Sequence, residues 1–223
     1  MNLKIIKTSD GSHSIHNDKI NETYHSIHGS IAESNHVYIN SGLKYILDRG
    51  KEKDISVLEI GFGSGLNFLL LKKYIEKKRL SIYYHTIEPF PLPGDIYKKL
   101  NYVKLLGDDL RDVYHTIHNL GEKEIKIGKD ITFRKSIKTL EEVSLENNYF
   151  DTIFFDAFAP SKQPEIWSFQ NLSKVYNSMK KDAVLVTYCS SSKFKKTLND
   201  VGYKVDVLRG PVGKKEMVRA SKR

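Results

Sequence analysis

One carboxylate follows a stretch that is otherwise apolar. The residues Ile153–Phe155 lead directly into Asp156, which is followed by Ala-Phe-Ala-Pro. In an α/β sheet, the carboxyl ends of the strands form the crevice that binds ligands. A carboxylate in that crevice can orient a nucleophile and take up or relay its proton. Asp156 is therefore the candidate catalytic residue, and the alternative is an aspartate that caps a turn or a helix.

Three glycines stand at alternate positions in VLEIGFGSGLN, and they are Gly61, Gly63 and Gly65. Glycine lets the backbone approach a ligand closely, and the N–H groups at the start of a following helix are free to bind it. The next apolar stretch, SIYYHTIE, ends on Glu88. A carboxylate at that strand end can accept hydrogen bonds from both hydroxyls of an adenosine ribose, so the pattern predicts an adenosine-containing cofactor.

The spacing of these glycines favours S-adenosylmethionine over a dinucleotide. A dinucleotide site shows G-x-G-x-x-G, whereas here the third glycine comes one residue early. Glu59 completes an E-x-G-x-G-x-G pattern, which is typical of S-adenosylmethionine sites. That cofactor has no pyrophosphate, and Glu59 can balance its ammonium group directly or through water. Asn67, which follows the last glycine by two residues, joins the predicted cofactor contacts.

Alternating strands and helices place these residues at one edge of a sheet. Residues 49–223 are predicted to form a doubly wound, Rossmann-like α/β domain with an antiparallel edge. Residues 1–48 are predicted to form a small N-terminal extension packed on it, with a hairpin at Asp10-Gly11 and then helices. The main elements predicted in the domain are strands at 55–60, 81–88, 131–135, 150–157 and 183–189, helices at 64–78, 109–119, 136–145, 164–180 and 191–202, and a closing strand pair within 203–220.

The composition is that of a soluble globular protein. The chain has 223 residues, 39% hydrophobic and 28% charged, enough for one domain with a substantial core. No apolar run approaches the ~20 residues that span a bilayer, and the first residues lack a signal-peptide pattern. The single cysteine, Cys189, suits a reducing compartment. These features predict a cytoplasmic location without membrane attachment.

Positive charge is concentrated near one end of the chain. The net charge is +9, and residues 190–223 contribute ten Lys or Arg against three acids. A basic patch beside a nearly neutral body predicts a polyanionic partner such as RNA. A solvated lysine-rich surface is the alternative interpretation.

Several segments together resemble one known family. LEIGFGSGLNFL, DAFAPSKQPEIW and GYKVDVLRGPVGKKEM are similar to the methyltransferase of bacterial wobble-uridine modification. That family is called MnmD when free-standing and is the methyltransferase half of MnmC when fused. The N-terminal DGSHSIHNDKINETYHSIHGSIAESNHVYI also has the family's D-G-S, Y-H-S and H-V-hydrophobic-I steps. The resemblance covers nearly the whole chain and implies a class I S-adenosylmethionine-dependent methyltransferase fold.

The resemblance also implies a reaction and its partners. The family methylates the amine of 5-aminomethyl-(2-thio)uridine at the tRNA wobble position, giving the 5-methylaminomethyl derivative. The implied partners are tRNA and the enzymes that install the 5-aminomethyl group. Fused members carry a FAD-dependent oxidase, and because 223 residues leave no room for it, the single-activity form is expected. Asp156 would then face the attacking amine.

The same resemblance suggests how the substrate is held. Phe158, Pro160 and Trp167 would wall the pocket and stack on an extruded uracil. The alternative for Trp167 is packing of its helix on the sheet. Basic residues late in the chain would contact tRNA phosphates, and the candidates are Lys193, Arg209, Lys214 and Lys215.

Two stretches depart from the pattern of the family, and three residues of the N-terminal block are further candidates. Where many class I methyltransferases have an acidic residue to meet adenine, this chain has Lys135 and Ser136, so Ser136 becomes the candidate adenine contact. Pro89 and Phe90 stand where a basic residue followed by an aromatic one is expected. In the N-terminal block, three residues would line the cofactor or base pocket or else pack the block on the core, and they are Tyr24, His25 and Glu33.

Two other functions stay open. The chain could methylate another amine, or it could be a non-catalytic RNA-binding module of the same fold, which the Lys135–Ser136 departure would favour. The pairs His13/His16 and His25/His28 have H-x-x-H spacing, but no cysteine accompanies them and methyl transfer needs no metal. No metal site is therefore expected.

Overall fold

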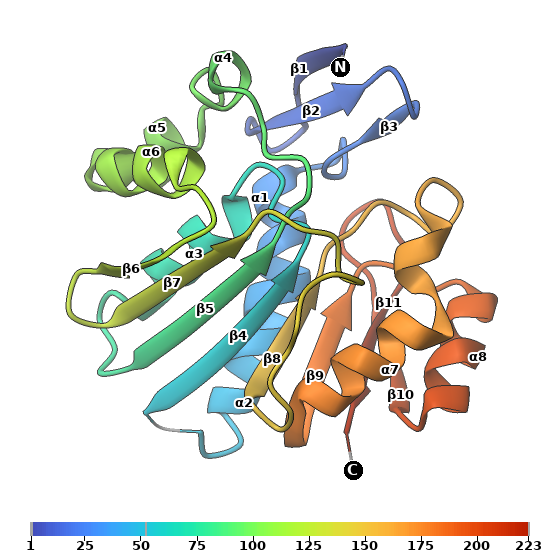
Figure 1. Ribbon diagram of the computed structural model, residues 1–223. Coiled ribbons are helices and arrows are strands. Elements are labelled where there is room, and N and C mark those ends of the chain that lie inside the picture. Colours follow the sequence, from blue (N-terminus) through green and yellow to red (C-terminus); the bar gives the residue numbers. More distant parts are fainter. Residues whose placement is uncertain (1, 52, 223) are drawn as a thin grey trace.

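A mixed sheet forms the centre of the molecule in residues 2–51 and 53–222, the part of the chain that the computed structural model describes (Figure 1). Its strand order is β10-β11-β9-β8-β4-β5-β7-β6, and β9, β8, β4, β5 and β7 are parallel. This confirms the predicted Rossmann-like α/β fold. The strands are β4 (Asp54–Ile60), β5 (Ser81–Ile87), β6 (Glu124–Ile127), β7 (Ile131–Ser136), β8 (Phe150–Phe155), β9 (Met179–Thr187), β10 (Lys204–Arg209) and β11 (Glu216–Ser221).

Alternate residues of the central strands face two different helical layers. In β4, Ile55 and Val57 belong to one apolar core, and Leu58 and Ile60 belong to the other. Because both faces are buried, these strands are continuous apolar runs in the sequence. The first core is completed by α1 (Ser30–Ser34), η1 (Asn35–Lys44), α2 (Tyr45–Leu47), α3 (Leu66–Ile75), α4 (Gly94–Tyr97), α5 (Tyr102–Leu106), η2 (Asp108–Leu110) and α6 (Arg111–Asn119), and the second by η3 (Pro164–Trp167), α7 (Phe169–Ser178) and α8 (Ser192–Val201).

The N-terminal block combines a small sheet with helices that join the core. The predicted hairpin is present as β1 (Leu3–Lys7) and β2 (His13–Asn17), to which β3 (Glu22–Thr23) adds. This sheet lies above the carboxyl ends of the central strands (Figure 1). The turn residue Asp10 accepts a hydrogen bond from the N–H of Ala32 at 2.9 Å, which ties the hairpin to the first turn of α1.

Both edges of the large sheet carry antiparallel strands. The closing pair predicted within 203–220 is present as β10 and β11, and β11 lies between β9 and β10, antiparallel to both. At the other edge β6 pairs with β7, also antiparallel. β6 was not predicted from the sequence. It is a four-residue strand at the edge of the sheet, and its side chains are exposed or only partly buried.

The helix predicted over 136–145 is wrong. Thr139 begins a single turn in which its N–H and hydroxyl donate to Glu142, and no helix follows. The ammonium group of Lys174 donates to the carbonyls of Leu140 and Glu141 at 2.7 and 2.8 Å. A contact from α7 therefore supplies the partners that a helix would have supplied.

Side-chain caps define the helices near the pocket. The predicted helix 164–180 is divided at Ser168, whose side chain accepts from the N–H of Asn171 and begins α7. Ser191 caps α8 in the same way, at the start of the helix predicted over 191–202. Gly202 ends α8 in the left-handed conformation, at the end of that predicted helix.

Candidate active site

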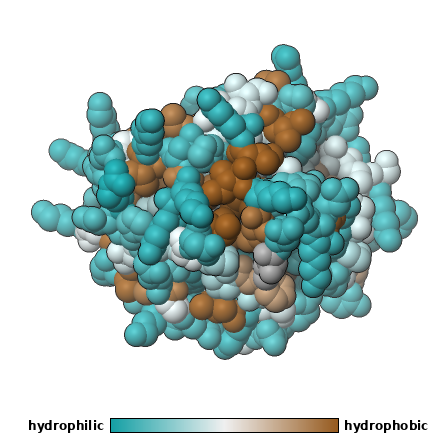
Figure 2. Space-filling model, turned by 90° about the horizontal axis from the view of Figure 1, so that it is seen from above, coloured by the Kyte–Doolittle hydropathy of each residue, from teal (hydrophilic) through white to brown (hydrophobic). Residues whose placement is uncertain are grey.

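A pocket of about 830 Å³ opens at the carboxyl ends of β4, β5 and β8. This volume is of the size that holds a cofactor or a drug-sized ligand. Figure 2 views the molecule from the side of the N-terminal block and shows apolar side chains gathered near the middle of that face, surrounded by hydrophilic ones. Nine of the predicted site residues line the pocket, and they are Tyr24, His25, Glu33, Gly61, Gly63, Glu88, Asp156, Phe158 and Lys214.

Asp156 follows β8 directly and is held by two neutral side chains. Its Oδ1 accepts from the hydroxyl of Tyr38 at 2.6 Å, and its Oδ2 accepts from Nδ2 of Asn67 at 2.8 Å. Because both donors are side chains rather than backbone N–H groups, Asp156 does not act as a helix cap. Burial raises the pKa of its carboxyl group to about 7. A carboxyl group with this pKa can gain and lose a proton near neutrality.

Glu59 lies behind Asp156 and has no exposed surface. Its Oε1 accepts from Nδ2 of Asn67 at 3.1 Å, and its Oε2 accepts from the hydroxyl of Thr86 at 2.8 Å. Burial, with a contribution from the charge of Asp156, raises the pKa of Glu59 to about 8. The amide of Asn67 therefore joins two buried carboxyl groups, and Glu59 can influence a pocket ligand through that amide.

Glu88 is bound by the backbone around the glycine loop. Its Oε2 accepts from the N–H of Gly63, and its Oε1 accepts from the N–H of Phe90, both at 2.9 Å. Burial raises the pKa of the Glu88 carboxyl group. A carboxylate held in this way beside Gly63 faces the pocket with its remaining acceptor positions.

The glycine loop also contacts Asp156. The backbone of Gly61 has φ 90°, and a Cβ at this position would collide with the carbonyl oxygen of Asp156. The N–H of Asp156 donates to the carbonyl of Ile60 at 2.8 Å. The loop after β4 and the loop after β8 are therefore in direct contact, and only glycine fits between them.

Sequence comparison agrees with this fold and pocket. Residues 101–223 match a family described as S-adenosyl-L-methionine-dependent methyltransferase. The chain belongs to this family. The methyltransferase also has similar relatives among curated proteins, in two bifunctional proteins named tRNA 5-methylaminomethyl-2-thiouridine biosynthesis bifunctional protein MnmC. The one from Campylobacter hominis is 30% identical over 92% of this chain, and the one from Leptospira interrogans is also 30% identical over 92%.

The methyltransferase matches only one part of these relatives. It spans 30% of the Campylobacter hominis protein and 33% of the Leptospira interrogans protein, which is about a third of their length. The crystal structure of MnmC2 from Aquifex aeolicus is similar in fold, with a TM-score of 0.79 and 23% identity over 99% of this chain and 70% of that one.

The residues at the glycine loop fit S-adenosylmethionine, the cofactor of the family. The buried Oδ1 of Asn67 has no hydrogen-bond partner among the described residues, so it is available to accept from an ammonium group. Glu88 offers carboxylate oxygens to ribose hydroxyls. A Cβ on Gly63 would lie 3.0 Å from the ring of Tyr24, so glycine keeps this wall open.

The far wall of the pocket comes from the N-terminal block and the loop before β11. Glu33 and Lys214 form an ion pair at 2.7 Å, although 181 positions separate them in the chain. The ammonium group of Lys214 also lies 3.7 Å from the centre of the Tyr188 ring. The rings of Tyr24 and Phe158 meet edge to face at 5.0 Å. Together these side chains form an aromatic, mildly charged part of the pocket lining.

His25 lines the same wall as a neutral imidazole. Its backbone N–H donates to the hydroxyl of Ser14 at 3.0 Å, which joins it to β2. Burial lowers the pKa of His25 to about 4. The ring is therefore uncharged at neutral pH and can donate or accept a hydrogen bond without adding a charge.

Several predicted contacts lie outside the pocket lining. Trp167 is buried against Phe155 and Phe194 and donates from Nε1 to the carbonyl of Phe158 at 2.8 Å, so it supports the pocket loop from below. The hydroxyl of Ser136 is buried and bonded to His85. The other predicted residues outside the lining are Glu59, Gly65, Asn67, Pro160, Lys193, Arg209 and Lys215.

Lys135 is buried and has a structural partner. Its ammonium group donates to the carbonyls of Ile117 and His118 at 3.2 Å, at the C-terminal end of α6. A cation there interacts favourably with the helix dipole and satisfies free carbonyls. Lys135 stands where many class I methyltransferases have an acidic residue, and these contacts show that the fold accommodates a lysine there.

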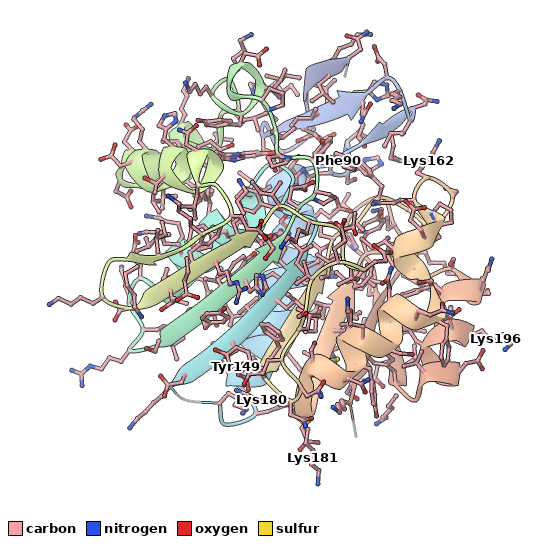
Figure 3. The ribbon with its side chains drawn as sticks, in the orientation of Figure 1. Phe90, Tyr149, Lys162, Lys180, Lys181 and Lys196 are labelled. Carbon is pink, nitrogen blue, oxygen red and sulfur yellow. The ribbon has the colours of Figure 1, made fainter. Side chains whose placement is uncertain are left out.

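Four residues of the site are not among the predicted site residues. Tyr38 reaches Asp156 from η1, and the pocket rim includes Lys19, Phe90 and Lys162. Figure 3 shows Phe90 and Lys162 at the pocket end of the molecule, while Lys180 and Lys181 lie at the opposite end and Lys196 projects from α8. Positive charge at the rim thus comes partly from outside the basic segment 190–223.

Two further findings concern the described residues only. They contain no group of three or more His, Cys, Asp or Glu side chains placed to hold a metal ion. None of their helices combines the length and the apolar character that crossing a bilayer requires.

Proposed function

We propose that this methyltransferase converts 5-aminomethyl-(2-thio)uridine to 5-methylaminomethyl-(2-thio)uridine at the wobble position of tRNA. The observation that carries the proposal is Asp156, a carboxylate that no cation among the described residues contacts and that lies in the pocket of an S-adenosylmethionine-dependent methyltransferase. The MnmC names of its relatives supply the substrate. Enzymes that install the 5-aminomethyl group would supply this substrate.

In this proposal the pocket divides into two ends. Glu88, Asn67 and the glycine loop hold the cofactor, with Glu59 acting through Asn67. When bound, S-adenosylmethionine supplies a methyl group on a sulfonium sulfur, so that a C–N bond forms as the C–S bond breaks. Tyr24 and Phe158 enclose the uracil, and stacking of this kind is worth ~1–3 kcal/mol per base.

Asp156 acts on the substrate amine. An alkyl amine is mostly protonated at neutral pH and must lose a proton before its nitrogen has a lone pair. The carboxylate accepts a hydrogen bond from the amine, aims the nitrogen and takes up the proton at Oδ1 or Oδ2. A negative charge also favours the protonated amine, which makes orientation the larger part of the effect.

Charged residues are proposed to act both next to the base and farther along the tRNA. Glu33 and Lys214 form one wall of the pocket, next to the base. Contacts to phosphate fix the register of a nucleic acid without reading its sequence. We assign such contacts to exposed basic residues on α8 and on both sides of the loop before β11, namely Lys193, Arg209 and Lys215.

The test uses tRNA from a strain that makes the 5-aminomethyl group and lacks its methylation. After incubation with methyl-labelled cofactor, nucleoside mass spectrometry is expected to find the label in the wobble nucleoside. tRNA that lacks the aminomethyl group is the matched control and is expected to stay unlabelled. Absence of label in the wobble nucleoside would contradict the proposed substrate, and label transferred to another amine would identify a different one.

A further inference from the structure

Tyr38 is a buried residue that reaches the candidate catalytic carboxylate. It lies on the π-helical segment η1, is 1% exposed, and packs its ring against Phe154 at 5.4 Å between centroids. Its hydroxyl donates to Oδ1 of Asp156 at 2.6 Å. π-Helical turns occur frequently at functional sites, because they place a side chain where a regular helix would not.

The other oxygen of Asp156 is held from a different element. Nδ2 of Asn67, on α3, donates to Oδ2 at 2.8 Å. An ionised carboxylate has about four acceptor positions, so two donors leave room for a ligand on each oxygen. Tyr38 and Asn67 thus fix the plane of the carboxylate and leave acceptor positions free for a ligand.

Few charged groups are placed to stabilise the ionised form of Asp156, so the hydrogen bond from Tyr38 matters for it. Lys214 is the nearby cation, and it is bonded to Glu33. Glu59 lies on the far side of Asn67, and burial raises the pKa of its carboxyl group to about 8, so it supplies no balancing cation. Neutral hydroxyl and amide donors therefore carry most of the stabilisation of the ionised carboxylate. The other titratable side chains that sense the charge of Asp156 are Tyr84, Tyr102 and Tyr188.

We propose that Tyr38 is a positioning residue for methyl transfer, whose hydroxyl orients Oδ1 of Asp156 and stabilises the ionised carboxylate that receives the substrate amine. This inference rests on the proposed function. It differs from a packing role, in which the ring of Tyr38 would fill the core and its hydroxyl would have no effect on catalysis.

Tyr38→Phe removes the hydroxyl and keeps the ring. Because a donor to the ionised form lowers a pKa, its loss raises the pKa of Asp156 above its value of about 7. The acid limb of the pH profile of kcat/KM is expected to move upward by about one pH unit, and kcat at pH 7 to fall about fivefold with KM little changed.

Tyr203→Phe is the matched control. Its hydroxyl is also buried and donates to the carbonyl of Leu172 at 3.0 Å, in the other core and away from Asp156. This variant is expected to lose stability and keep the pH profile of the wild type. An unchanged profile in Tyr38→Phe, or the same shift in both variants, would overturn the proposal.

A second measurement does not need activity. In protein carrying ¹³Cζ-tyrosine, the signal that is absent from Tyr38→Phe is assigned to Tyr38; in the wild type it is expected to shift more than those of the other buried tyrosines as Asp156 titrates near pH 7, and to lose that shift in Asp156→Asn. If no tyrosine signal does so, the proposal is wrong. If the signal titrates but the aminomethyl tRNA is not methylated, the Tyr38–Asp156 pair stands and the proposed substrate fails.

Discussion

Two aspartates stand at opposite ends of β8 in very different surroundings. Asp151, at its start, is 1% exposed and pairs with Lys51 at 2.8 Å and Lys180 at 2.7 Å. It also accepts from the N–H of Ser56 at 2.9 Å. Asp156, just past the end of the strand, is bonded only by neutral donors among the described residues. The first carboxylate is balanced by cations and holds the fold together, whereas the second is left unbalanced in a pocket.

The largest difference between the two aspartates is expected in catalysis. Asp156→Asn keeps the shape of the side chain, since its amide can donate to the oxygen of Tyr38 and its carbonyl can accept from Asn67. Loss of the carboxylate is expected to lower kcat about 10²–10⁴-fold. Methyl transfer measures this effect, and calorimetry is expected to find cofactor affinity little changed. Unchanged turnover would remove Asp156 from the mechanism.

The pH dependence of the rate is the next largest effect. Burial raises the pKa of Asp156 to about 7, so the carboxyl group takes up a proton as the pH falls through that value. Below pH 7, kcat/KM of the wild type is expected to fall about tenfold per pH unit from this group. The substrate amine titrates in the same way with the wild type and with Asp156→Asn. The difference between their pH profiles therefore gives the contribution of Asp156. If the activity of Asp156→Asn still falls below pH 7 as in the wild type, the group that titrates near pH 7 is not Asp156.

At the other end of β8 the effect is expected in stability. Asp151→Asn removes charge-assisted hydrogen bonds, at a cost of about 1–3 kcal/mol. Lys51 and Lys180 are partly exposed and return to water, which keeps the cost below that of a sealed ion pair. Denaturant unfolding measures the loss, and kcat of the folded protein is expected to stay unchanged.

A surface pair gives the matched control for that variant. Asp200→Asn removes an exposed partner of Lys196 on α8, and its effect is expected to stay within about 0.5 kcal/mol. If Asp151→Asn were no more harmful than Asp200→Asn, the structural role assigned to Asp151 would be wrong.

A second effect of Asp156→Asn, on stability, has the opposite sign to that of Asp151→Asn. The pKa of Asp156 is raised in the folded state, so its favourable contribution is present below the unfolded pKa of ~3.9 and is lost as the pH rises through about 7. Asp156→Asn is therefore expected to unfold at higher denaturant concentration than the wild type at pH 8. The difference should narrow as the pH falls from 7 towards 4. If Asp156→Asn is less stable than the wild type at pH 8, the carboxylate of Asp156 is not unbalanced in the folded protein.

The sequence predicted those parts of the site that local chemistry determines. The glycine loop, Glu88 and Asp156 each stand at a strand end, and strand ends follow from apolar runs and turns. Gly202 and Ser191 ended and began a helix for the same local reasons. The parallel pairing of the central strands followed from the alternation of strands and helices along the chain.

The parts that were missed depend on contacts between distant residues. Nothing near Tyr38 indicates that η1 is π-helical or that its hydroxyl meets a residue 118 positions away. The helix over 136–145 failed because Lys174 binds the carbonyls that would have bonded within it. Trp167 was assigned to stacking and to packing alike, and only its partners Phe155 and Phe194 distinguish the two.

The position of β11 has a consequence for biosynthesis. β11 pairs with both β9 and β10, so β10 has no neighbour in the sheet until residues up to Ser221 have been made. Lys214, which closes the pocket wall against Glu33, is also synthesised after β4, β5 and β8. A nascent chain can therefore assemble β4, β5 and β8 during translation, yet it has no complete pocket until Lys214 and β11 have followed.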